Sequence, residues 1–293
     1  MILSSIDIGS NAIRQVIVEV DASGNYKILN KHREMIRLGS DVFNYKKIQD
    51  ITLKRLIAAF KRMAKLNKRF KVEKSLALAT SAFRDARNKK PILLAIFKTS
   101  GIRIKVISGL KEAQLIRMAV QHSIGLNGEN SLLIDIGGGS VELTHLSQNK
   151  ILYSKSFKWG MVRMLTEAIK ANETPHDLIK SKLEKSAKKL PKGPFEVAIG
   201  TGGNLDAIAK LKMVLLRRGP NTAVTLNELC RIYHLFKKIP PALRMAKLNL
   251  RADRVDVLEP ALYFTLFIMR KYKINRLKIP GVGLKEGAII SLM

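Results

Sequence analysis

Short apolar runs rich in β-branched residues alternate along the chain with longer amphipathic stretches, a pattern typical of alternating strands and helices. Residues 13–20 read Ile-Arg-Gln-Val-Ile-Val-Glu-Val, which predicts a strand. In residues 50–66, apolar side chains from Leu53 to Phe60 recur at helical spacing, which predicts a helix. In the first part of the chain we further expect strands at 2–8, 26–38, 75–79 and 104–107, and helices at 91–98 and 111–122.

The same order of elements begins again near residue 132. Strands are expected at 132–136, 141–147, 150–157, 196–199 and 275–279, and helices at 161–169, 176–189, after the glycine turn at 200–203, at 226–238, at 253–271 and from 284. Alternation of strand and helix indicates an α/β architecture.

An internal repeat accompanies this order. Ser-Ile-Asp-Ile-Gly-Ser at 5–10 and Leu-Ile-Asp-Ile-Gly-Gly-Gly-Ser at 133–140 are two versions of one strand–turn–strand unit. Repeated supersecondary units suggest duplicated domains, and a cleft between two such domains is a natural ligand site. We therefore expect an N-terminal domain at 1–124 and a C-terminal domain at 125–293.

Charge narrows the range of partners. The chain has 53 Lys and Arg against 23 Asp and Glu, a net charge of +30. So large an excess repels itself and favours a polyanionic partner, such as nucleic acid, acidic lipid or polyphosphate. The one cysteine, Cys230, excludes an intramolecular disulfide and a cysteine-rich zinc site. With no spanning apolar run and no secretory signal, we expect a cytoplasmic protein without a membrane partner.

The glycine turns are the candidate chemistry. A strand that ends in Asp-x-Gly and turns into a second strand lets backbone N–H groups approach an anion closely. The aspartate would repel a bare phosphate unless a cation lies between them, so two matched hairpins suggest a Mg²⁺–phosphate site across the cleft. Either hairpin alone is more simply a strand connection. Gly200-Thr-Gly-Gly-Asn204 and Gly281–Gly287 place two further glycine turns before helices, where N-termini attract anions.

The order of the motifs resembles the exopolyphosphatase/guanosine pentaphosphate phosphatase family. The segments that carry the resemblance are Asp7–Arg14, Ala79–Ala86, Ile107–Ala113, Asp135–Glu142, Gly160–Glu167 and Gly283–Gly287. The resemblance covers nearly the whole chain. It implies two ribonuclease-H-like domains of the actin/Hsp70/sugar-kinase superfold around a central cleft, in the short two-domain form of the family.

The resemblance also implies roles for individual residues. It makes Glu112 the general base, where the residues alone favour a first-turn glutamate stabilised by the helix dipole. It makes Asp7, Asp135 and Glu142 the ligands of Mg²⁺, with a monovalent cation as a further candidate. The implied phosphate-binding residues are Asn11, Arg84, Gly138, Gly139, Ser140, Gly202 and Gly203. For Arg84, a surface ion pair with Asp85 or a helix cap is the alternative interpretation.

The leading functional hypothesis is hydrolysis of the terminal phosphate of inorganic polyphosphate. Guanosine pentaphosphate hydrolysis, linked to the stringent response, is the enzymatic alternative. A kinase of the same superfold and a polyphosphate-binding protein with weakened catalysis are the others, and nucleic-acid binding and a homodimer stay open. Ala12, Lys111 and Asn204 depart from the family pattern, which puts the rate of catalysis in question.

Overall fold

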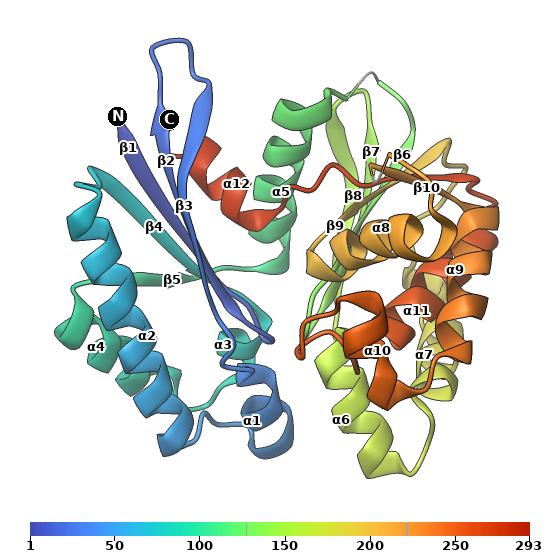
Figure 1. Ribbon diagram of the computed structural model, residues 1–293, viewed down its shortest axis with the longest axis horizontal. Coiled ribbons are helices and arrows are strands. Elements are labelled where there is room, and N and C mark those ends of the chain that lie inside the picture. The colour runs from blue at the N-terminus through green and yellow to red at the C-terminus, as the bar shows by residue number, and fades with distance from the viewer. Residues whose placement is uncertain (127, 221) are drawn as a thin grey trace. The chain divides into compact units, whose positions relative to one another are not determined.

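The computed structural model describes residues 1–126, 128–220 and 222–293, and its contacts divide the chain into two compact units. Unit 1 contains Met1–Ala119 and Gly283–Met293, and unit 2 contains Val120–Val282. The chain leaves unit 1 within one helix and returns to it between Val282 and Gly283 (Figure 1). The two domains expected from the sequence repeat, at 1–124 and 125–293, stay a prediction.

The sheet of unit 1 has five strands in the order β3-β2-β1-β4-β5. They are β1 (Ile2–Ile8), β2 (Ile13–Val20), β3 (Tyr26–Glu34), β4 (Lys74–Ala79) and β5 (Ile104–Val106). The first three form an antiparallel meander, and β4 and β5 continue the sheet parallel to β1. The carboxyl ends of β1 and β4 therefore meet at one edge, where α/β sheets bind their ligands.

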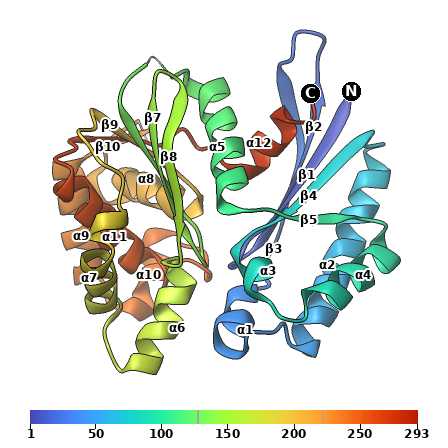
Figure 2. The same ribbon diagram turned by 180° about the vertical axis from the view of Figure 1, so that it is seen from behind.

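Helices cover both faces of this sheet. They are α1 (Leu38–Tyr45), α2 (Asp50–Arg69), α3 (Ser81–Asp85), α4 (Lys89–Ser100), α5 (Gly109–Ile124) and α12 (Leu284–Ile290). Helices α2 and α4 pack together on one face, and α12 packs on β1 and β2 from the other (Figure 1 and Figure 2). In the core beneath α12, Ile289 contacts a cluster that contains Leu3, Val16 and Val18.

Unit 2 repeats the arrangement. Its six strands lie in the order β10-β11-β9-β6-β7-β8, and they are β6 (Ser131–Ile136), β7 (Val141–Ser147), β8 (Lys150–Phe157), β9 (Val197–Thr201), β10 (Ala223–Thr225) and β11 (Arg276–Lys278). Strands β6, β7 and β8 form the antiparallel meander, and β9 and β11 continue parallel to β6. Each unit thus contains the same ordered core, as the sequence repeat predicted.

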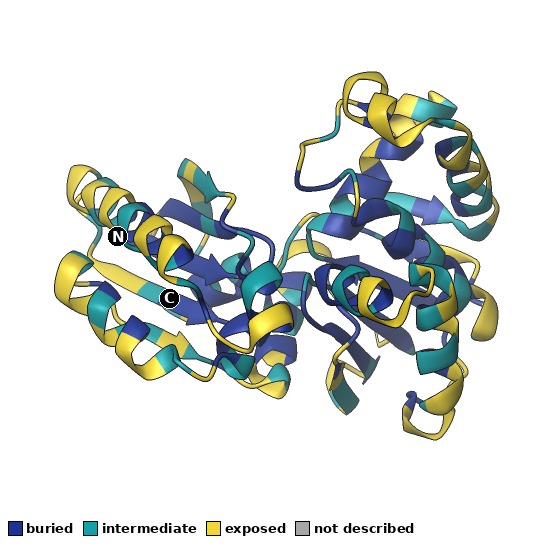
Figure 3. Cartoon of the chain, turned by 90° about the horizontal axis from the view of Figure 1, so that it is seen from below, coloured by how far each residue is buried: buried dark blue, intermediate teal, exposed yellow. Residues whose placement is uncertain are grey.

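The helices of unit 2 are α6 (Met161–Ala171), α7 (Pro175–Lys185), the 3₁₀ helix η1 (Ala187–Lys189), α8 (Gly203–Leu216), α9 (Leu226–Lys238), α10 (Pro241–Leu248) and α11 (Leu258–Lys271). Helix α8 packs on β6 and β9, and α9 and α11 pack on α8. Figure 3 shows the strands largely buried and the outer faces of the helices exposed. Among the described residues, no helix has the combination of length and apolar character that crossing a bilayer requires.

One expected helix is shorter than predicted. Apolar spacing suggested a helix over 253–271, but α11 begins at Leu258 and turns precede it. Asp253 and Arg254 are both buried there and form an ion pair, and Arg254 donates to the Asn204 side chain at 2.6 Å. Because buried charges must keep their partners, these contacts hold the segment in turns against α8. The short helices α1, α3 and α10 and the strand β10 were not expected.

Candidate active site

The β6–β7 hairpin of unit 2 brings two carboxylates side by side. Asp135 and Glu142 are directly opposite each other in the antiparallel register, so their side chains lie on the same face of the sheet. Both residues are buried. The turn between them is closed by a hydrogen bond from the Gly137 N–H to the Ser140 carbonyl (3.1 Å). Two buried carboxyl groups in this arrangement can both be ionised only with positive charge nearby.

Hydroxyl groups orient both carboxylates. The Thr201 hydroxyl, at the end of β9, donates to Asp135 Oδ1 at 2.9 Å. The Ser156 hydroxyl, on β8, donates to Glu142 Oε1 at 2.6 Å. Gly202 has a φ of +86°, and a Cβ there would lie 2.5 Å from Asp135 Oδ1, so only glycine fits. Strands on both sides of the hairpin therefore fix the two acids in place.

Helix α6 and the glycine before it contact the glycine turn of the β6–β7 hairpin. Arg163 is buried and donates from Nε to the Gly139 carbonyl at 2.7 Å, while its backbone N–H donates to the Gly138 carbonyl at 3.0 Å. A Cβ on Gly160 would lie 2.2 Å from the Gly139 nitrogen, so the helix N-terminus and the turn touch backbone to backbone. Arg163 thus binds carbonyl oxygens of the turn. The groups of the turn that can donate to an anion are its backbone N–H groups.

The third glycine turn lies beside this hairpin. Strands β6 and β9 are parallel neighbours, and the chain passes from Thr201 through Gly202 into α8, which starts at Gly203. The Asn204 side chain donates to the Ile136 carbonyl at 3.0 Å, which joins α8 to the end of β6. The first N–H groups of a helix lack partners within the helix and attract anions. The edge of unit 2 thus combines a helix N-terminus with the glycine turn and its two acids.

The equivalent hairpin of unit 1 contains both a carboxylate and a positive charge opposite it. Asp7 is directly opposite Arg14 in the register of β1 and β2, and the Arg14 guanidinium donates to Asp7 Oδ2 at 3.1 Å. Burial raises the pKa of Asp7, against the opposing effects of Arg14 and Lys285. Arg14 stands at the register position that Glu142 occupies in unit 2, so the two hairpins differ in charge where their turns are alike.

The predicted base of unit 1 has a fixed partner. Arg84, on α3, donates to Glu112 Oε2 at 2.8 Å and to the Ile107 carbonyl at 3.0 Å. Glu112 is buried in the first turn of α5. The ion pair therefore joins the predicted general base to a predicted phosphate-binding residue. It differs from the surface ion pair considered for Arg84, because both side chains are largely shielded from solvent.

Asn11 and the serines of unit 1 complete this edge. The Asn11 side-chain oxygen accepts from Arg37 Nε at 3.2 Å. Ser10 and Ser81 share a buried hydrogen bond of 2.9 Å, which links the β1–β2 turn to the N-terminus of α3.

Within each unit, the structure brings the predicted residues to one edge of the sheet. In unit 1 these are Asp7, Asn11, Arg84 and Glu112, and in unit 2 they are Asp135, Gly138, Gly139, Ser140, Glu142, Gly202 and Gly203. Thr201, Ser156 and Arg163 were missed as positioning residues. Thr201 and Arg163 both lie in segments that the sequence analysis had singled out, whereas Ser156 carries no motif signal.

The donor set of unit 2 fits a divalent cation. Asp135 and Glu142 offer hard carboxylate oxygens, which Mg²⁺ prefers, and phosphate oxygens complete its usual coordination. The unit 1 hairpin, with Arg14 beside Asp7, already holds a positive charge. Asp7 therefore stays a predicted ligand, whereas the pairing in unit 2 favours a metal directly.

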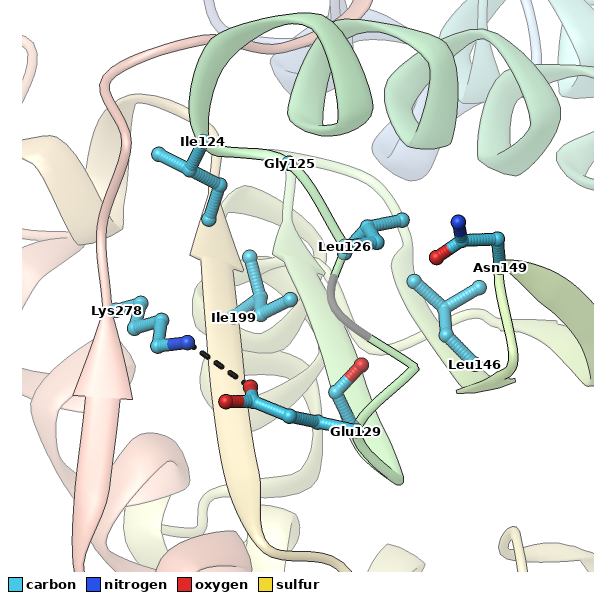
Figure 4. Close-up of a pocket in the computed structure, with 9 residues that line it drawn as sticks. Ile124, Gly125, Leu126, Glu129, Leu146, Asn149, Ile199 and Lys278 are labelled. Carbon is cyan, nitrogen blue, oxygen red and sulfur yellow. Dashed lines mark hydrogen bonds and ion pairs between the residues drawn. The ribbon is translucent and has the colours of Figure 1, made fainter.

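A small hollow of unit 2 lies away from these residues. It is lined by residues that include Ile124, Leu126, Ser131 and Leu146, and the Lys278 ammonium donates to Glu129 at 2.9 Å beside it (Figure 4). Ser131 is the first residue of β6, and Asp135 is near its last. The hollow is therefore at the opposite end of the strand from the carboxylate pair.

Comparison with known proteins gives a consistent picture. The model of the Ppx/GppA phosphatase family matches residues 16–293. Exopolyphosphatase 1 of Mycobacterium leprae is 24% identical over 99% of this chain and 89% of its own length. A bifunctional 3-dehydroquinate synthase/phosphatase of Fusobacterium nucleatum is 33% identical, in a match that covers 55% of this chain and 25% of that protein.

Solved structures agree with the fold. The Aquifex aeolicus member of the Ppx/GppA family is 25% identical and superposes with a TM-score of 0.81, covering 100% of this chain and 97% of its own. An exopolyphosphatase from Cytophaga hutchinsonii is 23% identical with a TM-score of 0.89, at the same coverage. Together with the repeated sheet order, these likenesses confirm the expected α/β fold of the actin/Hsp70/sugar-kinase superfold.

Proposed function

Since this chain belongs to the Ppx/GppA phosphatase family and is a phosphate-hydrolysing enzyme, we propose that it is an exopolyphosphatase. Its substrate is inorganic polyphosphate, from which it removes the terminal phosphate with the help of Mg²⁺. The observation that carries the proposal is the buried Asp135–Glu142 pair beside a glycine turn. This pair calls for a cation, and the turn and the α8 N-terminus call for an anion. The expected cytoplasmic location and the two domains at 1–124 and 125–293 belong to the same proposal.

Each group of residues has a task in this proposal. Asp135 and Glu142 would hold Mg²⁺, with Asp7 as the further predicted ligand, and the ion would supply positive charge to the phosphate. Gly138, Gly139, Ser140, Gly202 and Gly203 present N–H and hydroxyl donors to phosphate oxygens, and Asn11 and Arg84 do so from unit 1. Phosphoryl transfer needs mainly positioning and charge neutralisation, so this set is chemically sufficient.

Glu112 acts as the general base. Its carboxylate accepts a proton from water as the water oxygen forms a bond to the terminal phosphorus. The anhydride P–O bond breaks, and the shortened chain leaves with the bridging oxygen. The Arg84 contact at 2.8 Å fixes the direction of the carboxylate, so Arg84 orients the base as well as binding phosphate.

Guanosine pentaphosphate is the alternative substrate, because the family model covers both phosphatases under one description. The weakened-catalysis alternative rests on Ala12, Lys111 and Asn204. Asn204 is bound on both sides, to Ile136 and to Arg254. It serves the framework of the site, and its departure from the family pattern removes no proposed catalytic group.

The test is phosphate release from polyphosphate, guanosine pentaphosphate and ATP, measured side by side with and without Mg²⁺. The proposal expects Mg²⁺-dependent release, fastest from polyphosphate. Fastest release from the nucleotide would assign the alternative substrate. Binding of polyphosphate without release from any of the three would show the weakened form.

A further inference from the structure

Helix α2 carries a repeated pair of basic residues. Lys54-Arg55, Lys61-Arg62 and Lys68-Arg69 recur at intervals of seven residues. Seven residues are almost two helical turns, so each set of equivalent residues falls on one side of the helix. Asp50 in the first turn is the only acidic residue of this helix. The repeat therefore produces one lysine column and one arginine column.

The arginine column serves the fold of unit 1. Arg62 Nε donates to Glu34 Oε1 at 2.7 Å, and this hydrogen bond is the main cause of the lowered pKa of Glu34. Arg55 donates to the Met35 carbonyl at 2.7 Å. Both contacts join α2 to the end of β3. Two of the three arginines are therefore occupied by neighbours within the unit, and the Arg69 guanidinium lies 6.0 Å from the centre of the Phe70 ring.

The lysine column is exposed and has no such partners. Lys54, Lys61, Lys65 and Lys68 are all exposed, and none of their ammonium groups forms an ion pair or hydrogen bond in the part of the chain that the structure describes. We call these four residues the lysine stripe. At 1.5 Å per residue the stripe is about 21 Å long. Its like charges repel one another, so it is stabilised by a ligand that carries several negative charges in a row.

The chemistry of α2 favours a polyanion without bases. The other face of the helix is used by the core, through Leu56, Ala59 and Met63. Its one aromatic residue, Phe60, is fully buried. Single-stranded nucleic acids are held by aromatic side chains on which bases stack, and α2 exposes none. A single row of lysines along one side of a helix matches a single linear chain of phosphates.

We infer that the lysine stripe binds a stretch of long inorganic polyphosphate. The inference rests on the proposed function for its choice of ligand. Binding along the stripe retains a chain whose end is being hydrolysed elsewhere on the protein, so its effect grows with chain length. A triphosphate is far too short to occupy the stripe and the catalytic residues together.

The experiment compares two fourfold lysine variants of the full chain. The stripe variant is Lys54→Gln, Lys61→Gln, Lys65→Gln and Lys68→Gln. The matched control removes the same charge from four exposed lysines on four different helices, namely Lys210→Gln, Lys238→Gln, Lys247→Gln and Lys271→Gln. The measurements are KM for tripolyphosphate and for chains of several hundred phosphates across a salt series. Affinity for the long chain is measured separately in a Glu112→Gln background, where hydrolysis does not interfere.

The stripe variant should lose at least about tenfold in affinity for the long chain, with tripolyphosphate hydrolysis unchanged. Its salt slope should fall by about 3, since each lost contact on a single strand changes the slope by about 0.7. The scattered control should change affinity less than about twofold. Equal losses in the two variants would overturn the inference, because net charge alone would then explain them.

Two further arms test the identity of the ligand. Stripe-dependent binding of single-stranded RNA or of anionic vesicles, without stripe-dependent binding of long polyphosphate, would also overturn the inference. Should the wild-type protein release no phosphate from polyphosphate, the proposed function fails. The binding arm in the Glu112→Gln background still decides whether the stripe binds the long chain.

Discussion

One residue separates the chemistry of the two hairpins. Asp7 and Asp135 occupy equivalent positions in a repeated strand–turn–strand unit, but the opposite residue is Arg14 in unit 1 and Glu142 in unit 2. The positive charge beside Asp7 is therefore a side chain of the neighbouring strand. The second aspartate has a like charge there, so the two groups can both be ionised only beside a positive charge. This one register position therefore sets the charge of each hairpin, and in unit 2 it places two carboxylates side by side.

The second hairpin yields a prediction about metal dependence. Asp135→Asn should raise the Mg²⁺ concentration needed for half-maximal phosphate release by about tenfold or more, because it removes charge from a hard-cation ligand. The Mg²⁺ titration of the variant is compared with that of Thr201→Val, which removes only the hydroxyl that orients Asp135. An unchanged midpoint in Asp135→Asn, with activity uniformly reduced, would instead indicate a structural role.

Glu112 provides the clearest test of the mechanism. Glu112→Gln should lower turnover of polyphosphate by about 10²- to 10⁴-fold, the usual contribution of a general base, with binding nearly unchanged. The amide can still accept the Arg84 hydrogen bond, so the thermal unfolding temperature should fall only slightly. Turnover above a third of the wild-type value would remove Glu112 from the mechanism.

At the level of elements, the packing of three helices of unit 2 around His176 makes stability depend on pH. Its ring lies 4.5 Å from that of Tyr263 and 6.2 Å from that of Tyr233, between α7, α11 and α9. Burial is the main cause of its lowered pKa; Lys237 adds to it, and Glu259 and Asp177 oppose it. The unfolded chain thus binds a proton at a higher pH than the folded one does.

This difference predicts a loss of stability in acid. Between the ordinary histidine pKa of about 6.5 and its lower folded value, the free energy of unfolding falls as the pH falls. His176→Phe should flatten the dependence between pH 7 and pH 5, measured by chemical denaturation at each pH. His234→Phe, an exposed histidine on α9, is the matched control. Equal pH dependence in wild type and His176→Phe would contradict the assignment.

The elements also show what sequence reasoning can reach. The hairpins were predictable because a local pattern, Asp-x-Gly after a strand, was repeated. The hydroxyls of Thr201 and Ser156 reach the acids from strands that are remote in sequence, so only the sheet order reveals them. The residues before Leu258 have helical spacing, but the buried Asp253–Arg254 pair overrides it. Local periodicity cannot anticipate a segment whose conformation depends on such distant partners.

For the whole molecule, the important feature is that unit 1 is built from two separate parts of the chain. Unit 2 lies in sequence between two parts of unit 1, because the chain returns to unit 1 only at Gly283. Helix α12 then packs on β1 and β2. A Cβ on Gly287 would lie 2.0 Å from the Leu115 carbonyl oxygen on α5. Unit 1 is thus completed by a close backbone contact between distant segments.

That contact can be tested by a single methyl group. Gly287→Ala should destabilise the protein by about 1–3 kcal/mol, because both partners are backbone and one helix must move. Thermal or chemical unfolding measures the loss, and Ser291→Ala, an exposed position in the same segment, is the control. A loss no larger than that of the control would mean that α12 and α5 do not meet as described.

The return of the chain to unit 1 also has a consequence for the time at which this protein can fold. A ribosome releases β1 to β5 early, yet the helix that covers β1 emerges only after all of unit 2. Until then Leu3, Val16 and Val18 lack Ile289, their partner in the finished core. Unit 2 can fold as soon as its own strands are synthesised. The face of the unit 1 sheet that α12 covers stays exposed until the end of synthesis. The part of this protein that is made first is therefore the part that is finished last.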